Sequence, residues 1–420
     1  MLRELHRELP ALLLVGPRAT GKTTTAARHA ATVVRLDRPG EAAAFAADPD
    51  AALRGLAEPV LLDEWQTVPG VLGAVKRAVD TDPRPGRFLL TGSVRADLDE
   101  PTWPGTGRVV RLAMYPLTVA EQRGRSDVEP LLDRLARGDI LDVPADPPDL
   151  RGYVELALRG GFPEAALSQS TLARQRWLES YVEQLVTRDA MHVDGGRDPE
   201  RLRRFFEAYA LNSAGLADDA TLHRAAGINR KTGLAYERLL TNLMVVDAVP
   251  AWTTNRLKRL VQTPKRYLVD PSLLVGILRV DEDAVMRDGD LLGRVLDTFV
   301  AAQLRSELVV AAARPRLYHL RQQAQRREID LLAELGAGRV VGIEVKAHAG
   351  PGRDAARHLV WLREELGDRF VAGVVLHTGS RVYELDERIV AAPICTLWAS
   401  ESVTPRSSRV DPARRSRASG

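Results

Sequence analysis

Lysine, cysteine and long apolar runs are all scarce in this chain of 420 residues. Its single cysteine, Cys395, excludes an intramolecular disulfide and agrees with a reducing compartment. No apolar run approaches the roughly 20 residues that span a bilayer. The start of the chain alternates in charge and does not resemble a signal peptide. The sequence therefore predicts a cytoplasmic protein that does not associate with membranes.

Basic residues exceed acidic residues only slightly, and the formal net charge is +3. That value is too small to identify a nucleic-acid partner. Only six of the 59 basic residues are lysine, and a codon bias toward guanine and cytosine explains most of this imbalance. Lysine is still needed where a compact ammonium does what a planar guanidinium cannot. Two of the six, Lys22 and Lys346, end motifs that indicate chemistry.

Hydrophobic patterning divides the chain into five parts. Short apolar runs alternate with polar or helical connections at the start, which predicts a parallel α/β sheet. Its expected strands are Ala11–Val15, Val33–Asp37, Val60–Asp63, Phe88–Thr91 and Arg108–Leu112. The expected parts are an α/β domain (1–125), a mobile linker rich in Asp, Pro and Arg (126–150), a helical and winged-helix region (151–280), a second α/β domain with a mixed sheet (281–399), and a disordered tail (400–420).

The first lysine motif is a phosphate loop between the strand at Ala11–Val15 and a helix that follows it. Glycines let backbone amides approach phosphates, Lys22 pairs with the β- and γ-phosphates, and the Thr23 hydroxyl ligates Mg²⁺. The sequence therefore predicts an ATP site with Mg²⁺. Its expected contacts are Gly16, Pro17, Arg18, Ala19, Thr20, Gly21, Lys22, Thr23 and Thr24.

Two later strands end in residues that suit the same site. Asp63 and Glu64 follow an apolar strand, so Asp63 can hold Mg²⁺ while Glu64 orients and deprotonates the attacking water. Ser93 follows the next apolar strand and can sense the γ-phosphate. An acidic pair alone is equally consistent with a helix cap or a solvated turn. Together with Lys22, it predicts an ATPase.

The second lysine motif is typical of restriction-endonuclease-like domains. Asp297 lies on an expected helix, Asp330 on a strand, and Glu344 and Lys346 face one side of the next strand. Asp297, Asp330 and Glu344 would bind Mg²⁺ or Mn²⁺, while Lys346 orients or deprotonates a nucleophile. A Glu-Val-Lys tripeptide is also common on exposed strands. Cleavage, non-cleaving DNA binding and purely structural retention all remain open.

A helix–turn–helix is expected over Ala220–Leu243, followed by β-like segments that could form a wing. Arg230 and Lys231 lie near the start of its second helix, where a DNA reader exposes side chains. Such a unit also serves as a lid or an oligomer contact, and no dense basic stripe accompanies it. The motif therefore indicates fold more strongly than function.

These motifs together resemble a bacterial family of AAA-type ATPases of the additional-strand class, which joins a winged-helix region and a C-terminal restriction-endonuclease-like domain of unknown function. The chain departs from the family at Trp65, where relatives usually carry isoleucine or valine. It also departs at Asp297, where they usually carry glutamate. The resemblance makes Arg108 a candidate to reach a γ-phosphate, either in its own subunit or in a neighbouring one, and in the second case the protein would be a homo-oligomer. A surface arginine that leads into a strand explains Arg108 equally well. The motifs that carry it are Leu61-Leu62-Asp63-Glu64-Trp65-Gln66, Leu90-Thr91-Gly92-Ser93, Gly107-Arg108, Tyr115-Pro116-Leu117-Thr118, Thr187-Arg188-Asp189, Pro264-Lys265-Arg266-Tyr267 with Asp270, and Asp330 with Glu344-Val345-Lys346.

The leading functional expectation is an ATPase that couples its nucleotide state to a nuclease-like domain that acts on or binds nucleic acid, with DNA favoured. The alternative is an ATP-dependent regulatory switch, in defence, toxin–antitoxin or signalling, whose nuclease-like domain is inactive and binds a partner. A DNA-binding regulator that uses Arg230 and Lys231 is a third expectation.

Overall fold

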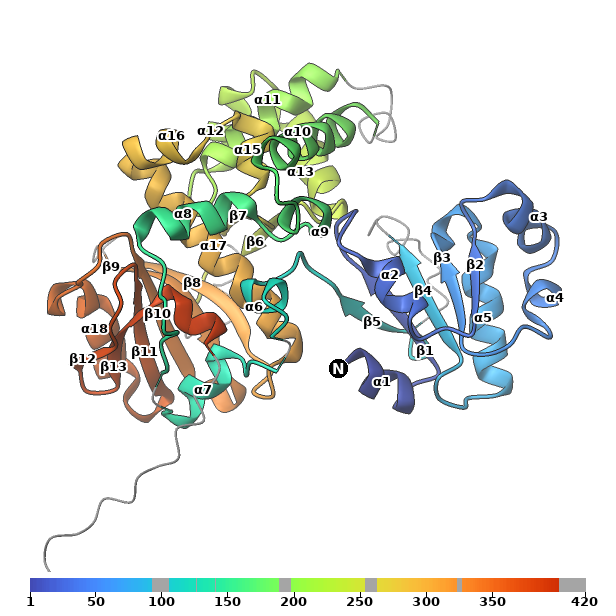
Figure 1. Ribbon diagram of the computed structural model, residues 1–420, viewed down its shortest axis with the longest axis horizontal. Coiled ribbons are helices and arrows are strands. Elements are labelled where there is room, and N and C mark those ends of the chain that lie inside the picture. Colours follow the sequence, from blue (N-terminus) through green and yellow to red (C-terminus); the bar gives the residue numbers. More distant parts are fainter. Residues whose placement is uncertain are drawn as a thin grey trace, which may run out of the picture.

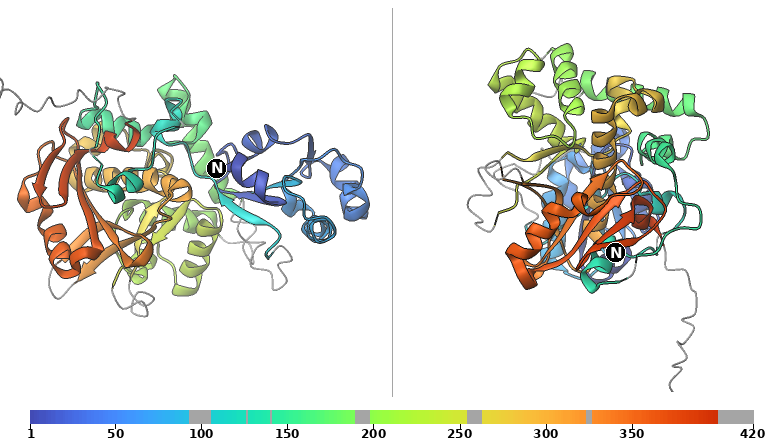
Figure 2. Two further views of the ribbon diagram at one scale, coloured as in Figure 1. Left: turned by 90° about the horizontal axis from the view of Figure 1, so that it is seen from below. Right: turned by 90° about the vertical axis from the view of Figure 1, so that its left-hand side faces the viewer.

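The computed structural model describes residues 1–92, 106–125, 127–139, 141–188, 198–253, 263–322 and 327–399. Figure 1 shows an N-terminal α/β domain in blue, a helical middle region in green to yellow, and a C-terminal α/β domain in orange to red. The two α/β domains lie at opposite ends of the molecule in Figure 1 and in the left panel of Figure 2. The expected disordered tail, 400–420, lies outside the described residues.

The N-terminal domain is built on a parallel five-stranded sheet, as its alternating pattern predicts. The strand order is β2 (Thr32–Arg35), β3 (Val60–Asp63), β4 (Phe88–Gly92), β1 (Ala11–Val15) and β5 (Val110–Ala113). Strands β1, β3 and β4 are apolar and fully buried, because helices cover both faces of a parallel sheet. Its helices are α1 (Leu2–Glu8), α2 (Lys22–Ala27), α3 (Pro39–Ala47), α4 (Pro49–Leu53), η1 (Trp65–Thr67) and α5 (Gly70–Thr81).

The segment expected to be a mobile linker is instead packed on the C-terminal domain. It contains α7 (Leu131–Arg137), which follows the short α6 (Val119–Gln122). The Asp133 carboxylate accepts from the backbone amides of Ala312 and Ala313 at 2.8 and 2.9 Å. Composition suggested a linker because Asp, Pro and Arg are frequent, but the leucines of α7 are buried along one helical face. The expectation of a mobile connection is therefore wrong over α7.

The middle region is helical, as expected, and includes one pair of strands. In the helix–turn–helix segment, a Cβ at Gly233 would lie 2.0 Å from Nε2 of the buried His223, so the two helices pack closely there. The elements are α8 (Leu150–Arg159), α9 (Pro163–Ala166), α10 (Thr171–Thr187), α11 (Pro199–Leu211), α12 (Asp219–Ala225), α13 (Arg230–Asn242), β6 (Val246–Val249) paired antiparallel with β7 (Lys265–Leu268), α15 (Leu273–Leu278) and α16 (Glu282–Arg287).

The C-terminal domain has the expected mixed sheet, extended by two strands that the sequence did not predict. Its strand order is β12 (Tyr383–Asp386), β13 (Ile389–Pro393), β11 (Phe370–His377), β10 (Val340–Lys346), β9 (Arg327–Glu334) and β8 (Arg316–Gln322). Strand β10 runs parallel to β11 and antiparallel to β9. The helical elements are α17 (Gly289–Val310), η5 (Gly336–Gly338), η6 (Arg353–Ala356), α18 (Arg357–Leu366), η7 (Gly367–Arg369) and η8 (Ile394–Trp398).

One hydrophobic core joins the middle region to the C-terminal domain. Buried residues from α8 and α10 belong to the same cluster as those of α17 and of one face of the C-terminal sheet, for example Tyr153, Leu178, Phe299 and Ile343. A perturbation in the middle region can therefore reach the C-terminal domain through packed side chains. In the parts of the chain that the structure describes, no helix has both the length and the apolar character to cross a membrane.

Candidate functional sites

The phosphate loop lies where the sequence predicts it, between the end of β1 and the start of α2. A Cβ at Gly16 would lie 2.0 Å from the Met114 carbonyl oxygen, and Gly21 has a φ of 83°, so both positions require glycine. The Thr20 hydroxyl donates to the Pro17 carbonyl at 2.9 Å. The loop is thus closed on itself and held against the residue that follows β5.

The ammonium group of Lys22 lies inside this loop. It is buried and donates to the carbonyl oxygens of Gly16 and Pro17 at 3.0 and 2.7 Å. Burial lowers the pKa of Lys22 to about 8, against the raising effect of Glu64 and Asp63. A phosphate would offer the ammonium a negative partner in place of neutral carbonyls, which makes a stronger hydrogen bond. The loop therefore holds a desolvated cation where an anion can pair with it.

The Asp63 carboxylate, at the end of β3, contacts both the helix that follows the phosphate loop and the end of β4. Its Oδ1 accepts from the Thr23 hydroxyl at 2.6 Å and from the Thr91 hydroxyl at 2.5 Å. Asp63 and Thr91 face each other because β3 and β4 are parallel neighbours. Ser93, the hydroxyl predicted from the sequence, lies outside the described residues. Thr91 belongs to the motif predicted at the end of this strand, although only Ser93 was predicted as a nucleotide contact.

Glu64, the predicted base, follows β3 in a left-handed backbone conformation with a φ of 53°. Its carboxylate accepts from the side-chain amide of Gln66. Gln66 in turn lies so close to β4 that a Cβ at Gly92 would be 2.7 Å from its Oε1. Residues at the end of β4 therefore help to orient the Glu64 carboxylate. Its role in activating water stays a prediction.

Arg108 lies away from this site. Val110 of β5 pairs with Leu12 of β1, so Arg108 is at the edge of the sheet opposite the phosphate loop. Its Nε donates to Asp80 Oδ1 at 2.7 Å on the surface. The expectation that Arg108 reaches a γ-phosphate bound to its own chain is therefore wrong. Contact with a nucleotide on a second copy stays a prediction.

Tyr181 of α10, which was not predicted, also touches the phosphate loop. Its hydroxyl donates to the Arg18 carbonyl at 3.3 Å, and its ring stacks on Trp177 with centroids 5.2 Å apart. These residues and Ala19 line a cavity of about 280 Å³ beside the loop. Thr24, another expected contact, is exposed in the first turn of α2. The spacing of Trp177 and Tyr181 indicates one helical face but cannot identify what that face meets.

The residues at this first site fit a nucleoside triphosphate with Mg²⁺. The Thr23 hydroxyl and the Asp63 carboxylate are hard oxygen ligands of the kind that Mg²⁺ prefers, and they lie together. Lys22 and the backbone amides of the loop suit the phosphates. The bound ion would offset charge on the β- and γ-phosphates.

The predicted second site contains a lysine that the sequence analysis did not assign. Lys265 of β7 donates to Asp297 Oδ2 at 2.5 Å and to Asp330 Oδ1 at 3.1 Å. The other oxygens are also used, because Asp297 Oδ1 accepts from the Tyr267 hydroxyl and Asp330 Oδ2 from the Val345 amide. Burial opposes the charge on Lys265, but the two carboxylates outweigh it and raise its pKa well above the usual value. The ammonium is therefore charged and lies between the two acids.

Glu344 and Lys346 lie on the same side of β10, as predicted, and pair with each other. Lys346 Nζ is 2.8 Å from Glu344 Oε2. Burial, and then the charge of Asp330, raise the pKa of Glu344 to about 8. Its Oε1 has no hydrogen-bond partner among the described residues, and His358 Nδ1 is 4.0 Å away. The pattern of acids and lysine predicted from the sequence is thus assembled, with Lys265 added to it.

A metal ion does not fit this arrangement as it stands. Asp297, Asp330 and Glu344 were expected to bind Mg²⁺ or Mn²⁺, but Lys265 lies between the first two and Lys346 pairs with the third. No group of three or more His, Cys, Asp or Glu side chains is placed to hold a metal ion within the described ranges. The sequence pattern missed this because Lys265 comes from a strand of the middle region.

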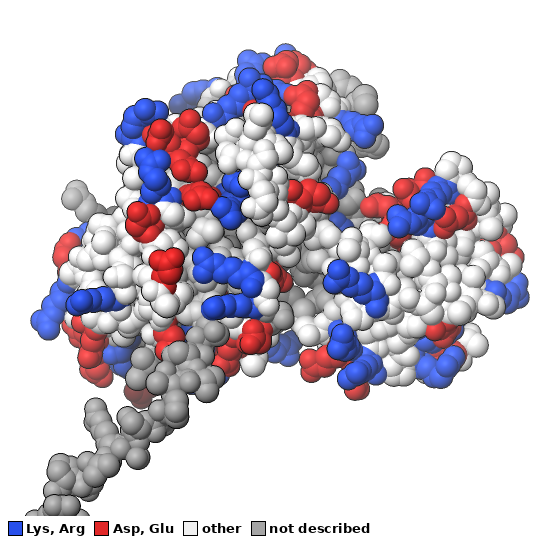
Figure 3. Space-filling view, in the orientation of Figure 1, with Lys and Arg blue, Asp and Glu red and all other residues white. Residues whose placement is uncertain are grey.

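Two cavities flank Lys346. One, of about 400 Å³, is lined in part by Arg294 and Arg321, and the other, of about 340 Å³, by His348 and Arg357. On the face drawn in Figure 3, basic and acidic side chains are interspersed. Carboxylates also line both cavities, among them Glu328 in the first and Asp354 in the second, so basic and acidic groups lie together around Lys346.

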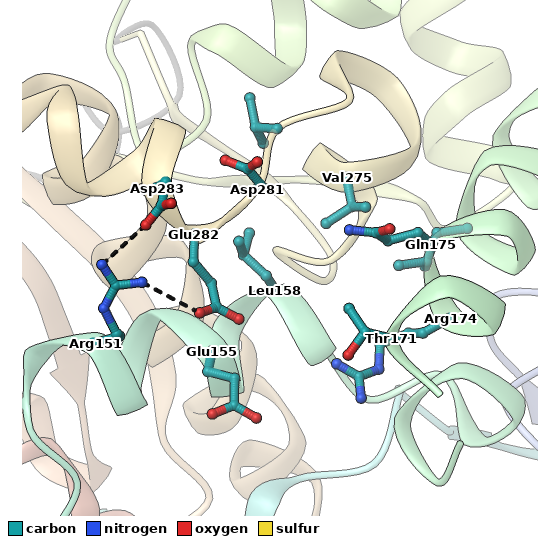
Figure 4. Close-up of a pocket in the computed structure, with 12 residues that line it drawn as sticks. Arg151, Glu155, Leu158, Thr171, Arg174, Gln175, Val275, Asp281, Glu282 and Asp283 are labelled. Atoms are coloured by element: carbon teal, nitrogen blue, oxygen red, sulfur yellow. Dashed lines mark hydrogen bonds and ion pairs between the residues drawn. The ribbon is translucent and has the colours of Figure 1, made fainter. Parts of the chain in front are cut away.

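A further cavity of about 210 Å³ lies among α8, α10 and α16 in the middle region (Figure 4). Arg151 crosses one side of it and pairs with Glu282 and Asp283 at 3.7 and 3.0 Å. The cavity shares no lining residue with the phosphate loop or the acid cluster. Half of its six charged side chains, those of Arg151, Glu282 and Asp283, pair with one another.

Three family models match consecutive parts of the chain. Residues 8–122 match a family described as an AAA domain, and residues 150–284 and 292–397 match two domains of unknown function, DUF8612 and DUF4143. A solved structure, the Walker-type ATPase PABY2304 of Pyrococcus abyssi, aligns with a TM-score of 0.42 and 16% identity, covering 66% of this chain and 93% of that one.

Two mycobacterial relatives match the chain over most of its length. It is 30% identical over 406 residues to the uncharacterized protein Rv2008c of Mycobacterium tuberculosis, and equally to Mb2031c of Mycobacterium bovis. Each alignment covers 96% of this chain and 83% of the relative. With an AAA domain over the phosphate loop and DUF4143 over the acid cluster, the chain belongs to a family of AAA-type ATPases that carry a DUF4143 domain.

Proposed function

We propose that this ATPase is a switch in which the nucleotide bound to the N-terminal domain controls what the C-terminal domain binds, with DNA as the first partner to test. Mg²⁺ accompanies ATP at Thr23 and Asp63, and Lys22 offsets negative charge on the phosphates. Glu64 orients and deprotonates the attacking water. The ATP-dependent conformational change is the output of the reaction.

The contact between the phosphate loop and α10 carries this proposal. Tyr181 holds the Arg18 carbonyl, so a movement of the loop on nucleotide binding acts directly on α10. Helix α10 packs on α11, and α11 packs on β7, which carries Lys265 into the acid cluster. A packed route of side chains supports coupling, and coupling itself must be measured.

Nucleic-acid binding is supported by the placement of basic groups. Arg230 and Lys231 are exposed at the start of α13, which fits a winged helix made of α12, α13 and the β6–β7 pair. Arg294 and Arg321 line the cavity beside Lys346 in the nuclease-like domain. Guanidinium and ammonium groups of this kind bind backbone phosphates.

The test is DNA affinity in the presence of ATP, ADP or no nucleotide. Glu64→Gln should still bind ATP while hydrolysis falls by about 10²-fold or more, and its DNA affinity should stay at the ATP-state value. Lys22→Ala should lose the effect of nucleotide. Tyr181→Phe should hydrolyse ATP but show a smaller difference between nucleotide states. The same DNA affinity for wild type in all three conditions would reject the switch.

Metal-dependent cleavage is the second candidate. The adjacent placement of Asp330, Glu344 and Lys346 favours it. The contact between Lys265 and Asp330 opposes it, because the lysine would have to leave this acid before a metal ion could bind. The assay is cleavage of single- and double-stranded DNA and RNA with Mg²⁺ or Mn²⁺, with and without ATP. Cleavage that Lys346→Ala abolishes would support a nuclease. No cleavage of any substrate by wild type would leave the non-cleaving switch.

A further inference from the structure

We propose that Lys265 takes the place of a metal ion in the acid cluster, so that a cation of the chain itself neutralises Asp297 and Asp330 and fastens the middle region to the C-terminal domain. This inference concerns the acid cluster alone and is independent of ATP hydrolysis.

The contacts of Lys265 resemble those of a bound cation. Its Nζ lies 2.5 Å from Asp297 Oδ2, 3.1 Å from Asp330 Oδ1 and 3.4 Å from the Asp330 carbonyl oxygen. Charge-assisted N–H···O bonds are typically about 2.7–2.9 Å long, so the contact with Asp297 is short and the contact with Asp330 is slightly long, while both are hydrogen bonds. The remaining carboxylate oxygens accept from Tyr267 and Val345. All four oxygens of the two aspartates therefore have donors.

Burial makes it costly to replace this ammonium with a metal ion. Lys265 is only 2% exposed and Asp297 only 8% exposed. A dication would have to expel the lysine from its two partners, and a buried charge without a partner is strongly destabilising. Mg²⁺ would also have to give up much of the water that it usually keeps in protein sites. Lys265 lies between the carboxylates of Asp297 and Asp330, and Lys346 pairs with the third acid, Glu344.

The lysine and the two aspartates come from different parts of the chain, which their contacts hold together. Lys265 is on β7 of the middle region, Asp297 is on α17, and Asp330 is on β9 of the C-terminal sheet. A metal ion would hold only the two acids, whereas the lysine also anchors the β6–β7 pair to them. Cleavage by this site would require Lys265 to leave the acids first.

The experiment measures Mn²⁺ binding and melting temperature for the full-length protein. Lys265→Ala removes the charge and leaves room for a hydrated ion, while its matched control, Lys265→Met, removes the charge but fills the space of the stem. Both variants should melt below wild type without metal. Millimolar Mn²⁺ should raise the melting temperature of Lys265→Ala, and it should leave wild type and Lys265→Met unchanged. Adding Asp330→Asn to Lys265→Ala should remove the gain.

Calorimetric titration of wild type with Mn²⁺ decides the question even if the lysine variants fail to fold. Wild type should show no Mn²⁺ binding that depends on Asp330. Binding that is present in wild type and lost in Asp330→Asn would overturn the proposal, since the metal would then coexist with Lys265. A folded Lys265→Ala variant that Mn²⁺ does not stabilise would overturn it as well.

Discussion

Replacing Thr91 by valine tests how the nucleotide site holds Asp63. Valine has nearly the shape of threonine, so the change removes one hydroxyl without opening a cavity. Among the described residues, the Asp63 carboxylate, which is 4% exposed, then keeps the hydrogen bond from Thr23 alone. A hydrogen bond to a charged group contributes about 1.5–3 kcal/mol, and we expect the free energy of unfolding to fall by that amount.

The effect on ATP hydrolysis should be at least as large. If the Thr23 hydroxyl turns to Mg²⁺ when nucleotide binds, Thr91 is left as the side chain that donates to Asp63 in the part of the chain that the structure describes. At 1.4 kcal/mol per factor of ten, the same energy corresponds to a decrease in kcat/KM of roughly 10- to 150-fold.

Urea denaturation and phosphate release measure the two quantities for Thr91→Val. Thr91→Ser is the matched control, because it keeps the hydroxyl and should retain most of the stability and activity. A Thr91→Val variant as stable and active as wild type would refute the role assigned to this hydrogen bond.

Three further predictions concern other parts of the chain. Burial lowers the pKa of Lys22 to about 8 from its usual 10.5, so the ammonium is charged below about pH 8 and loses its proton above it. ATP affinity should therefore weaken as the pH rises from about 7 to about 9. An affinity that stays constant over this range contradicts the assignment. Gly233→Ala should lower the free energy of unfolding by about 1–3 kcal/mol, because the added methyl group would meet the ring of His223. The control, Gly293→Ala, adds a methyl group in open space on a helix and should not destabilise the protein. Equal stabilities of the two variants in thermal unfolding would argue against this packing. Arg108→Ala should leave ATP turnover unchanged in dilute protein, and a loss that appears only at high protein concentration would point to a contact in trans.

The first site could be predicted because its signals are local in the sequence. The phosphate loop follows an apolar strand, and Asp63 ends another, so parallel pairing brings them to one edge of the sheet. The contact from Tyr181 could not be predicted, because it depends on how α10 lies against the N-terminal domain. Composition misled over α7, where Asp133 and Arg134 look solvated in the sequence but make buried contacts in the structure.

The scarcity of lysine is informative at a third position besides the two motifs. A chain that uses arginine at most basic positions keeps lysine at Lys22 and Lys346, and the same reasoning applies to Lys265. Its neighbour Arg266 shows the difference, since that guanidinium spreads its donors over the Ala217 carbonyl and two carboxylates. Lys265 instead places one compact charge between two acids from separate elements. The two adjacent basic residues on β7 are equally buried, but they differ in how they distribute their donors, and they are therefore not interchangeable.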